Sequence, residues 1–566
     1  MSEKEFAEFL SSPNAVGFYT VYSEGALKYI DSNPYIHVGK IMGNFITIYI
    51  HINDVDTVIK SLTPSLINIF PYALGLLGTT ENEEAGITAV QNQTYLDLHG
   101  KDVLLAFIDT GIDYTNEIFK YEDGTTRIKA IWDQSLKGSF PQTYYFGAEY
   151  NEAEINEALS LEDPYSKVPH KDAVGHGTFL ASVAGARTND EYRGAAPEAE
   201  FIIVKLRKSN PYYLKRYLVP ETEENVFDSV DLMLGIEYVL EKAAELGKPV
   251  SICIGVGGTL SGHDGLNVFE SYLSLAAQRL GICITTAAGN ESQAKHHMSG
   301  VVDKAENQSQ IDIKVEENSG SFPVYIFNGI SDRFSVSVKS PTGEIVNRIP
   351  AKSGTILETR LTLEKAIVVV EYYFPIAQSG SQLTVVKILN PTPGVWRINV
   401  YGDILLIGEY NAWLPLTTLI SPGIEFSEPN PNYTVVSPAT SLVSITAGGY
   451  DEKTGSLYVN SSWGPTRLPI ITPDLVAPSL NVPGIFPDGQ GTMSGTSVAA
   501  AITAAAAALL LEWGINREFD AIINTYRIKG YLIRGCQRNK NEQYPNHESG
   551  YGKLNLIQAF NSLKNN

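Results

Sequence analysis

The stretch GTMSGTSVAAAITAAAAALLL, residues 491–511, determines how the whole chain is interpreted. From Val498 to Leu511 it is apolar apart from one threonine, and it is shorter than the roughly 20 residues that a membrane-spanning helix needs. It therefore predicts a helix buried in a folded core. Ser497 stands at the start of this helix. Such a serine is ordinarily a helix N-cap, but a helix start also stabilises negative charge beside a nucleophile.

Two earlier segments carry a carboxylate and an imidazole. In LLAFIDTGID, residues 104–113, an apolar strand runs into Asp109, so the carboxylate is expected at the carboxyl end of a strand, where open α/β sheets carry their sites. In GHGTFLASVAGA, residues 175–186, His176 lies between two glycines at the start of an Ala-rich helix and can face a cleft. Taken separately, the aspartate is ordinarily a turn former and the histidine a hydrogen-bonding residue of a helix start.

Together these residues form the set that acyl transfer requires: a nucleophile, a base that takes its proton and a carboxylate that orients the base. The three segments resemble the fingerprints D-T/S-G, H-G-T and G-T-S-x-A of the subtilisin superfamily, in the same chain order. The resemblance implies a serine endopeptidase with Asp109, His176 and Ser497 as its catalytic triad.

Further segments extend the resemblance. Three of them match the family's strand after the histidine helix and the segments that precede its serine: GAAPEAEFIIVKL (194–206), SSWGPT (461–466) and PDLVAP (473–478). Asn290, which ends ITTAAGN, matches the family's oxyanion asparagine. In the segment GVGG, the residues Gly255, Val256 and Gly257 match a substrate-binding edge strand to which an extended peptide adds. A simple glycine-rich turn is the alternative for GVGG.

The order of predicted elements indicates an α/β protein with three units. Residues 1–78 have the pattern of a small α+β unit, with the size and position of a subtilisin prodomain, and an acidic linker follows. Residues 79–290 and 437–566 alternate short apolar strands with helices, which predicts a subtilisin-like parallel-sheet catalytic domain. Residues 291–436 are β-rich and broken by Gly, Pro and Asn turns, which predicts an inserted β-sandwich of the jelly-roll kind.

Composition limits the possible partners. The formal net charge of −21 disfavours nucleic acid and membrane insertion, so we expect protein partners. The acidic start MSEKEFAEFL lacks the basic and apolar parts of a secretory signal. We therefore expect the protein to stay in the intracellular compartment where it is made. Cys253, Cys283 and Cys536 are too scattered for a disulfide framework or a metal cluster, and we expect neither a metal nor another cofactor.

The combination of an N-terminal unit, no secretory signal and an insertion after Asn290 is most similar to the Csp germination proteases of spore-forming bacteria. That resemblance implies a protease that cuts its own prodomain, keeps it bound as an inhibitor, and activates the precursor of a cortex-lytic enzyme by limited proteolysis. It also implies incorporation into the spore. We expect the self-cleavage between Leu76 and Glu81. Two alternatives are a catalytically silent subtilase-fold module that binds a germinant or another protease, and a broad intracellular housekeeping protease.

One basic segment stands out, LRKSNPYYLKRY at residues 206–217. It is expected to form a solvated loop. The alternative is a loop beside the substrate groove that selects acidic or polar substrate residues by charge complementarity.

Overall fold

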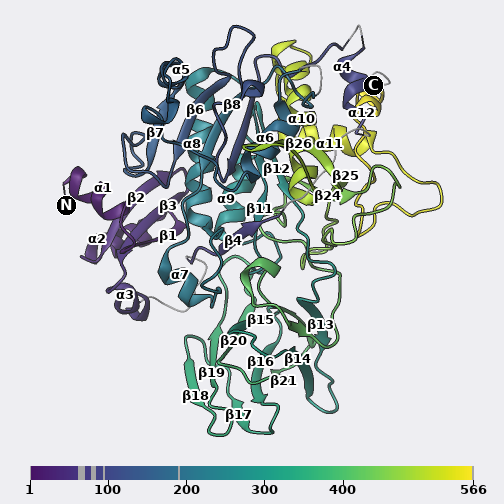
Figure 1. The fold of residues 1–566 in the computed structure, drawn as a ribbon. Coiled ribbons are helices and arrows are strands. Elements are labelled where there is room, and N and C mark those ends of the chain that lie inside the picture. The colour runs from purple at the N-terminus through teal and green to yellow at the C-terminus, as the bar shows by residue number, and fades with distance from the viewer. Residues whose placement is uncertain (1, 62–69, 78–84, 94–95, 189–191, 564–566) are drawn as a thin grey trace.

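The computed structural model describes residues 2–61, 70–77, 85–93, 96–188 and 192–563. Figure 1 shows three units in contact: an N-terminal unit in purple, an α/β unit in blue, teal and yellow, and a β-rich insertion in green at the bottom. The N and C termini lie on opposite sides of the α/β unit in this view. The architecture is therefore the expected α/β protein with an N-terminal α+β unit and an inserted β domain.

The N-terminal unit is an antiparallel sheet in the order β1-β3-β2 with helices on it, and β1 contacts α8 and α9 of the α/β unit. Its elements are α1 (Glu3–Leu10), β1 (Ala15–Val21), α2 (Glu24–Ser32), β2 (Ile36–Met42), β3 (Phe45–His51) and α3 (Val55–Ser61). The short apolar segment SLINIF, residues 65–70, has the pattern of a further strand and lies, except for Phe70, outside the described residues. The acidic linker lies outside them too.

The α/β unit is built on an eight-stranded sheet in the order β25-β24-β12-β10-β5-β8-β6-β7. All neighbours in it are parallel except β6 and β7, as expected for strands joined by crossover helices. The strands are β5 (Leu104–Asp109), β6 (Ile128–Asp133), β7 (Ala148–Asn151), β8 (Glu200–Lys205), β10 (Val250–Ile254), β12 (Ile282–Ala287), β24 (Ile445–Tyr450) and β25 (Leu475–Pro478). The helices are α4 (Ile87–Gln91), α5 (Glu152–Leu159), α6 (His176–Gly185), α7 (Pro211–Arg216), α8 (Ser229–Leu246), α9 (Val268–Ala276), α10 (Thr496–Leu511), α11 (Thr525–Gly535) and α12 (Leu556–Leu563).

The two faces of the sheet are covered by different helices. On β5, Leu105 and Phe107 pack in one core cluster with α6 and α10, while Leu104 and Ala106 pack in another with α8 and α9. This alternation follows from the two-residue period of a strand. Shorter elements complete the unit: β9 (Phe227–Asp228), β11 (Val256–Gly257), β26 (Val482–Phe486), β27 (Gly489–Met493), the 3-10 turns Glu117–Phe119 and Pro164–Ser166, and the π-turn Glu512–Asn516.

The insertion is a sandwich of two antiparallel sheets, in the orders β13-β22-β15-β20-β19-β18 and β17-β16-β21-β14-β23. A third core cluster fills the space between them. Its elements are β13 (His297–Val301), β14 (Gln308–Val315), β15 (Phe322–Asn328), β16 (Arg333–Lys339), β17 (Ile345–Ile349), β18 (Ile356–Arg360), β19 (Ile367–Tyr373), β20 (Gln382–Leu389), β21 (Gly394–Ile404), β22 (Glu409–Trp413), the 3-10 turn η4 (Thr417–Leu419) and β23 (Ile424–Phe426).

The apolar helix α10, which carries Ser497 in its first turn, lies in the centre of the α/β unit. All residues of α10 are buried. The helical stretch Thr496–Asn516 passes the length and composition test for a membrane span, but 89% of its apolar window is buried inside the protein. It is therefore a core helix, as expected. The three cysteines are likewise buried, with free thiols.

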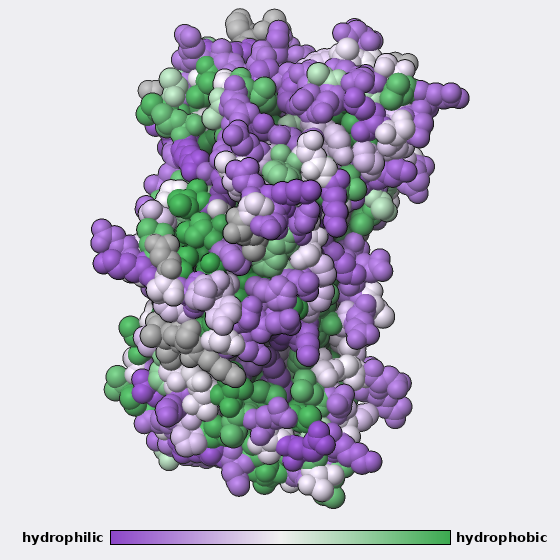
Figure 2. Space-filling view, turned by 90° about the vertical axis from the view of Figure 1, so that its left-hand side faces the viewer, coloured by the Kyte–Doolittle hydropathy of each residue, from purple (hydrophilic) through white to green (hydrophobic). Residues whose placement is uncertain are grey.

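The surface is mixed in character. In Figure 2, hydrophilic side chains cover most of the face that carries the N-terminal unit, and apolar side chains form separate patches, including one at the lower end over the insertion. Large apolar residues with high exposure in that domain include Ile345, Ile356 and Leu357. Scattered exposed apolar residues of this kind are normal for a folded domain.

The basic segment 206–217 is not the solvated loop that the sequence predicted. Its residues 211–216 form α7, and the segment contacts the N-terminal unit. Arg207 is paired with Asp231 at 2.8 Å, and the Tyr213 hydroxyl donates a hydrogen bond of 2.6 Å to the backbone oxygen of Gly17. Its tyrosines and asparagine form a surface that docks on the N-terminal unit. A prediction based on charge alone does not reveal this surface.

Candidate active site

The predicted catalytic residues come from three elements that meet beside the eight-stranded sheet. Asp109 is the last residue of β5, His176 the first of α6 and Ser497 the second of α10. Gly175, which precedes His176, has a φ of 85°, a left-handed conformation that glycine adopts without strain. The chain can therefore turn sharply into α6 and present the imidazole at its first position.

The three side chains are in hydrogen-bond contact in one line. His176 Nδ1 lies 2.7 Å from Asp109 Oδ1, and His176 Nε2 lies 3.2 Å from Ser497 Oγ. All three residues are buried, with exposures of 2, 4 and 0% for Asp109, His176 and Ser497. With a proton on Nδ1 held by the carboxylate, Nε2 is free to accept the proton of the serine hydroxyl.

The electrostatics of the site favour the imidazolium. Burial of His176 lowers its pKa, but the charge of Asp109 and the hydrogen bond to it act in the opposite direction, and the pKa is raised above the ordinary value of 6.5. Asp172 contributes in the same direction as Asp109. The base is thus stabilised in the protonated form that it adopts after taking the serine proton.

Asp172 is a functional residue that the sequence analysis missed. It is buried, and its carboxylate accepts hydrogen bonds from the N–H of Gly175 at 2.8 Å, the N–H of Thr178 at 2.8 Å and the Thr178 hydroxyl at 2.7 Å. These bonds satisfy backbone donors of the first turn of α6 and fix the turn that carries His176. An aspartate shortly before a helix start is a capping signal that could have identified it.

A second histidine–aspartate pair supports the turn after Asp109. His170 Nδ1 lies 2.7 Å from Asp133 Oδ2, and the N–H of Ile112 donates to His170 Nε2 at 3.2 Å. Both members of the pair are buried. No local pattern in the sequence indicated this pair, because its members lie in separate segments of the chain.

The glycine-rich segment has two different roles. A Cβ atom on Gly255 would lie 3.2 Å from Asp109 Oδ2 and 3.2 Å from Ser497 Cβ, so a side chain there would crowd the triad. Val256 and Gly257 instead form β11, the edge strand expected to bind an extended peptide. The structure therefore places Gly255 against the triad, and it places Val256 and Gly257 along the groove.

The groove is occupied by the chain's own segment. β4 (Ala73–Leu76) lies between β11 and β9 as the middle strand of a three-stranded antiparallel sheet. Leu76 is opposite Val256 and Gly75 opposite Gly257. We call residues 73–77 the tail. It binds by strand addition, the mode expected for a peptide substrate.

The tail ends in the position of an acyl group. The backbone N–H of Ser497 donates a hydrogen bond of 2.8 Å to the carbonyl oxygen of Leu77. Asn290 lies beside it, and its Oδ1 accepts from the N–H of Thr496 at 3.2 Å and from the Thr496 hydroxyl at 3.3 Å. These bonds use the oxygen of the amide and leave Nδ2, the donor that an oxyanion hole needs, outside them.

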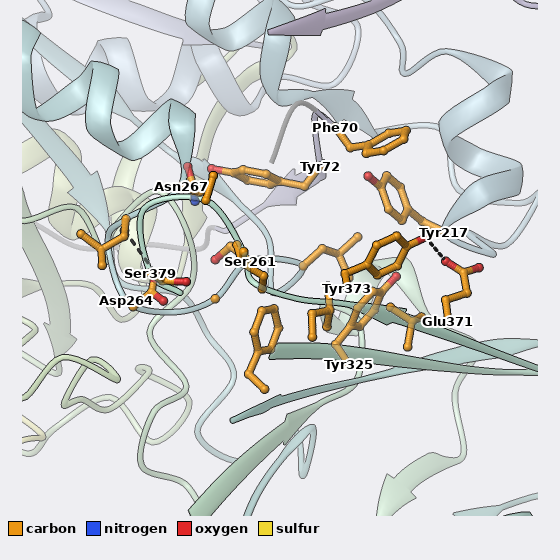
Figure 3. A pocket seen from close by; sticks show the side chains of 18 of the residues that line it. Phe70, Tyr72, Tyr217, Ser261, Asp264, Asn267, Tyr325, Glu371, Tyr373 and Ser379 are labelled. Atoms are coloured by element: carbon orange, nitrogen blue, oxygen red, sulfur yellow. Dashed lines mark hydrogen bonds between the residues drawn. The ribbon is translucent and has the colours of Figure 1, made fainter. Parts of the chain in front are cut away.

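The segment before the tail is anchored where the three units meet. The Tyr72 hydroxyl lies 2.7 Å from Ser437 Oγ, and the Tyr217 hydroxyl donates to the backbone oxygen of Pro71 at 2.6 Å. Figure 3 shows Phe70, Tyr72 and Tyr217 around a cavity that also includes Tyr325 of the insertion; its empty volume, open mouth included, is about 820 Å³. The segment before the tail is thus anchored to the α/β unit, beside a cavity that the insertion also lines.

A family model described as the subtilase family matches residues 100–321 and 417–552, which carry all three triad residues. The chain is a subtilase. The unmatched stretch between the two ranges lies inside the insertion.

Two of the solved structures that match this subtilase differ in their degree of similarity. The Clostridium perfringens CspB protease is 32% identical, with 85% of this chain and 98% of that chain covered and a TM-score of 0.74. The epidermin leader peptide processing serine protease EpiP from Staphylococcus aureus is 12% identical, with 97% and 99% covered and a TM-score of 0.45. No curated protein sequence matches the chain significantly.

The geometry explains the chemistry of this subtilase as a serine endopeptidase that acts on protein substrates. His176 takes the proton of Ser497 as the hydroxyl attacks a peptide carbonyl, and Asp109 holds the imidazole in the required tautomer. The N–H of Ser497 already points at a carbonyl oxygen, where negative charge develops in the tetrahedral intermediate. His176 then returns the proton to the leaving amine.

Proposed function

We propose that this subtilase cuts its own chain once, between Leu77 and Gly78, and then activates the precursor of a cortex-lytic enzyme during spore germination. The observation that carries the first step is the hydrogen bond from the Ser497 N–H to the Leu77 carbonyl oxygen. The expected cleavage range, Leu76 to Glu81, includes this bond, and its part from Gly78 onward lies outside the described residues.

The cut N-terminal unit stays bound as an inhibitor in this proposal. Three contacts support it, each to a backbone oxygen of that unit: Tyr213 to Gly17 at 2.6 Å, Asn210 to Ala15 at 2.9 Å and Arg207 to Leu10 at 2.8 Å. None involves the bond to be cut, so cleavage leaves them in place. The tail then remains in the groove as a bound product.

The germination role rests on similarity to the Csp proteases. The identity of 32% to the C. perfringens CspB protease over 85% of the chain supports a related role. From the resemblance to the Csp family we further propose a cortex-hydrolase precursor as the protein substrate and the spore as the location.

Intact mass analysis after denaturation tests the self-cleavage. Wild type should give two polypeptides separated at Leu77, and Ser497→Ala should give one uncut chain, because removal of the nucleophile leaves only the rest of the site, worth about 10³-fold over water. A wild-type protein that stays full length while it hydrolyses peptides would contradict the proposal.

Incubation with a purified cortex-hydrolase precursor tests the second step. We expect one new N-terminus in the precursor, identified by N-terminal sequencing, and no new N-terminus with Ser497→Ala. Casein serves as the comparison substrate. Extensive casein degradation with many cuts in the precursor would favour the housekeeping protease.

A further inference from the structure

Between its strands β22 and β23, the insertion runs across the tail. After β22 ends at Trp413, residues 414–419 run back toward the groove and finish in the turn η4, which contacts β4. We call residues 414–419 the return strap. Its leucines at 414, 416 and 419 are all buried. The strap thus adds a wall to a groove whose other two sides are β11 and β9.

The return strap is fixed to loops next to the active site. The N–H of Leu414 donates to the backbone oxygen of His296 at 2.9 Å, and the Thr259 hydroxyl donates to the backbone oxygen of Leu414 at 2.9 Å. The ring of Trp413, the residue just before the strap, stacks on the His263 ring with centroids 4.2 Å apart. Displacing the strap therefore breaks several buried contacts at once.

The strap crowds any side chain at Gly75. A Cβ atom built there would lie 2.5 Å from Thr418 Oγ1 and 2.9 Å from Leu416 Cδ2. An alanine requires small movements of these two side-chain ends, whereas a larger residue adds atoms to space that is already filled. Gly75 pairs in an antiparallel ladder and lies outside the left-handed backbone region. The preference for glycine at this position therefore comes from crowding by the strap, because the backbone conformation itself suits any residue.

The position of Leu77 shows which substrate residue the crowding at Gly75 affects. With the Leu77 carbonyl at the Ser497 N–H, Leu77 is the last residue before the cut, and Gly75 is the third. Leu74 and Leu77 are buried, with exposures of 0 and 1%, while Leu76 is partly exposed. The groove therefore encloses the first, third and fourth residues before the cut and leaves the second partly open.

We infer that Leu416 and Thr418 make this subtilase selective for glycine at the third residue before the scissile bond. The inference rests on the proposed self-cleavage for its register, and it applies equally to protein substrates that enter the same groove. The substrate class is a protein with an accessible extended segment of the kind Leu-Gly-x-Leu, cut after the last leucine. The insertion then contributes specificity through its return strap.

Substitution of Gly75 tests the selectivity in the full chain. We expect Gly75→Val to slow self-cleavage by about tenfold or more, since overpacking of this kind costs the equivalent of that factor. Gly329→Val is the matched control, because nothing lies within 4 Å of a Cβ atom at this exposed glycine. The control should cleave at the parent's rate, measured by intact mass over time.

Opening the strap should restore cleavage. The double variant Leu416→Ala with Thr418→Gly removes both atoms that crowd Gly75, so Gly75→Val in that background should recover most of the lost rate. Cleavage of Gly75→Val at the parent's rate with the strap intact would overturn the selectivity. So would a loss of cleavage that the open strap does not restore.

A second measurement separates this inference from self-cleavage itself. In uncut Ser497→Ala protein, Gly75→Val should lower the unfolding temperature by several degrees, and by clearly less when the strap is open, as in a double-mutant cycle. If wild type never cuts itself, the self-cleavage proposal fails. The unfolding temperatures of these variants still test whether Leu416 and Thr418 crowd position 75. Equal temperature shifts with closed and open strap would overturn the role of Leu416 and Thr418.

Discussion

His176 is controlled by two carboxylates that act on different parts of it. Asp109 holds the imidazole ring at 2.7 Å, and Asp172 holds the backbone turn that carries the ring. Both raise the pKa of His176 against the effect of burial. The ring is therefore oriented by one partner and positioned by the other, and the two effects can be separated by experiment.

The raised pKa gives a prediction about pH. A general base must be neutral, so activity should fall as the pH drops through the pKa of His176, and half of it should be lost at a pH above the ordinary 6.5. The measurement is kcat/KM against pH for the processed enzyme. A profile that is flat from neutral pH to well below 6 would show that another group or step controls turnover.

Asp109→Asn is the matched variant for this profile. It removes the charge that raises the pKa of His176, so burial dominates and the acidic inflection should move to lower pH. The rate at the plateau should fall by about 10⁴-fold, because the amide favours the wrong tautomer. An unchanged inflection in this variant would mean that the profile does not report His176.

At the scale of elements, local pattern was sufficient for the parts of the site that are local. The buried strand before Asp109, the glycine before His176 and the apolar helix after Ser497 each have a signal within a few residues. The contact between Gly75 and Thr418 has none, because the two residues lie far apart in the sequence. Such a contact depends on how the insertion packs against the tail in the folded protein.

The segment 206–217 shows a different limit of sequence interpretation. Its charges predicted a solvated loop, yet Arg207 pairs with Asp231, and the uncharged residues Asn210 and Tyr213 bind the N-terminal unit. A count of charges cannot distinguish a lysine in solvent from an arginine held by an aspartate. The partner surface must be known before such a segment can be interpreted.

The insertion is expected to stabilise the α/β unit. Its residues Tyr325, Phe327 and Val385 belong to the same core cluster as α10. The test variant lacks residues 302–408 and joins Val301 to Glu409, which are opposite each other in β13 and β22. We expect its free energy of unfolding to be lower by about 3 kcal/mol or more, because several large apolar contacts are lost. Thermal unfolding and limited proteolysis measure this. A shortened protein as heat-stable and as protease-resistant as the parent would contradict the stabilising role.

At the scale of the whole molecule, the three units meet around one peptide segment. The tail pairs with β11 and β9, its upstream end is anchored at Ser437 and Tyr217, and the return strap covers Gly75. The N-terminal unit therefore brings its own substrate into the groove as it docks. A segment that is held so close to the nucleophile reacts at a high effective concentration.

The rate of self-cleavage should therefore not depend on protein concentration. We expect the same first-order rate constant over a roughly hundredfold dilution, because an intramolecular reaction does not depend on concentration. The rate is measured by intact mass analysis of samples quenched with acid. Mixing Ser497→Ala chain with active wild type should leave the mutant chain uncut. Cleavage that slows on dilution, or mutant chain that is cut by wild type, would indicate a reaction between molecules.

The same docking surface should keep the cut fragment bound. Tyr213 is fully buried, so Tyr213→Phe leaves the Gly17 oxygen without its donor, a loss of about 1–3 kcal/mol that should weaken retention by about tenfold. Tyr526→Phe is the matched control, because Tyr526 is 50% exposed. In size-exclusion chromatography of dilute cut protein, wild type and the control should elute as one particle, and Tyr213→Phe should release fragment and gain peptidase activity. Release at the same concentration for all three proteins would show that Tyr213 does not hold the inhibitor.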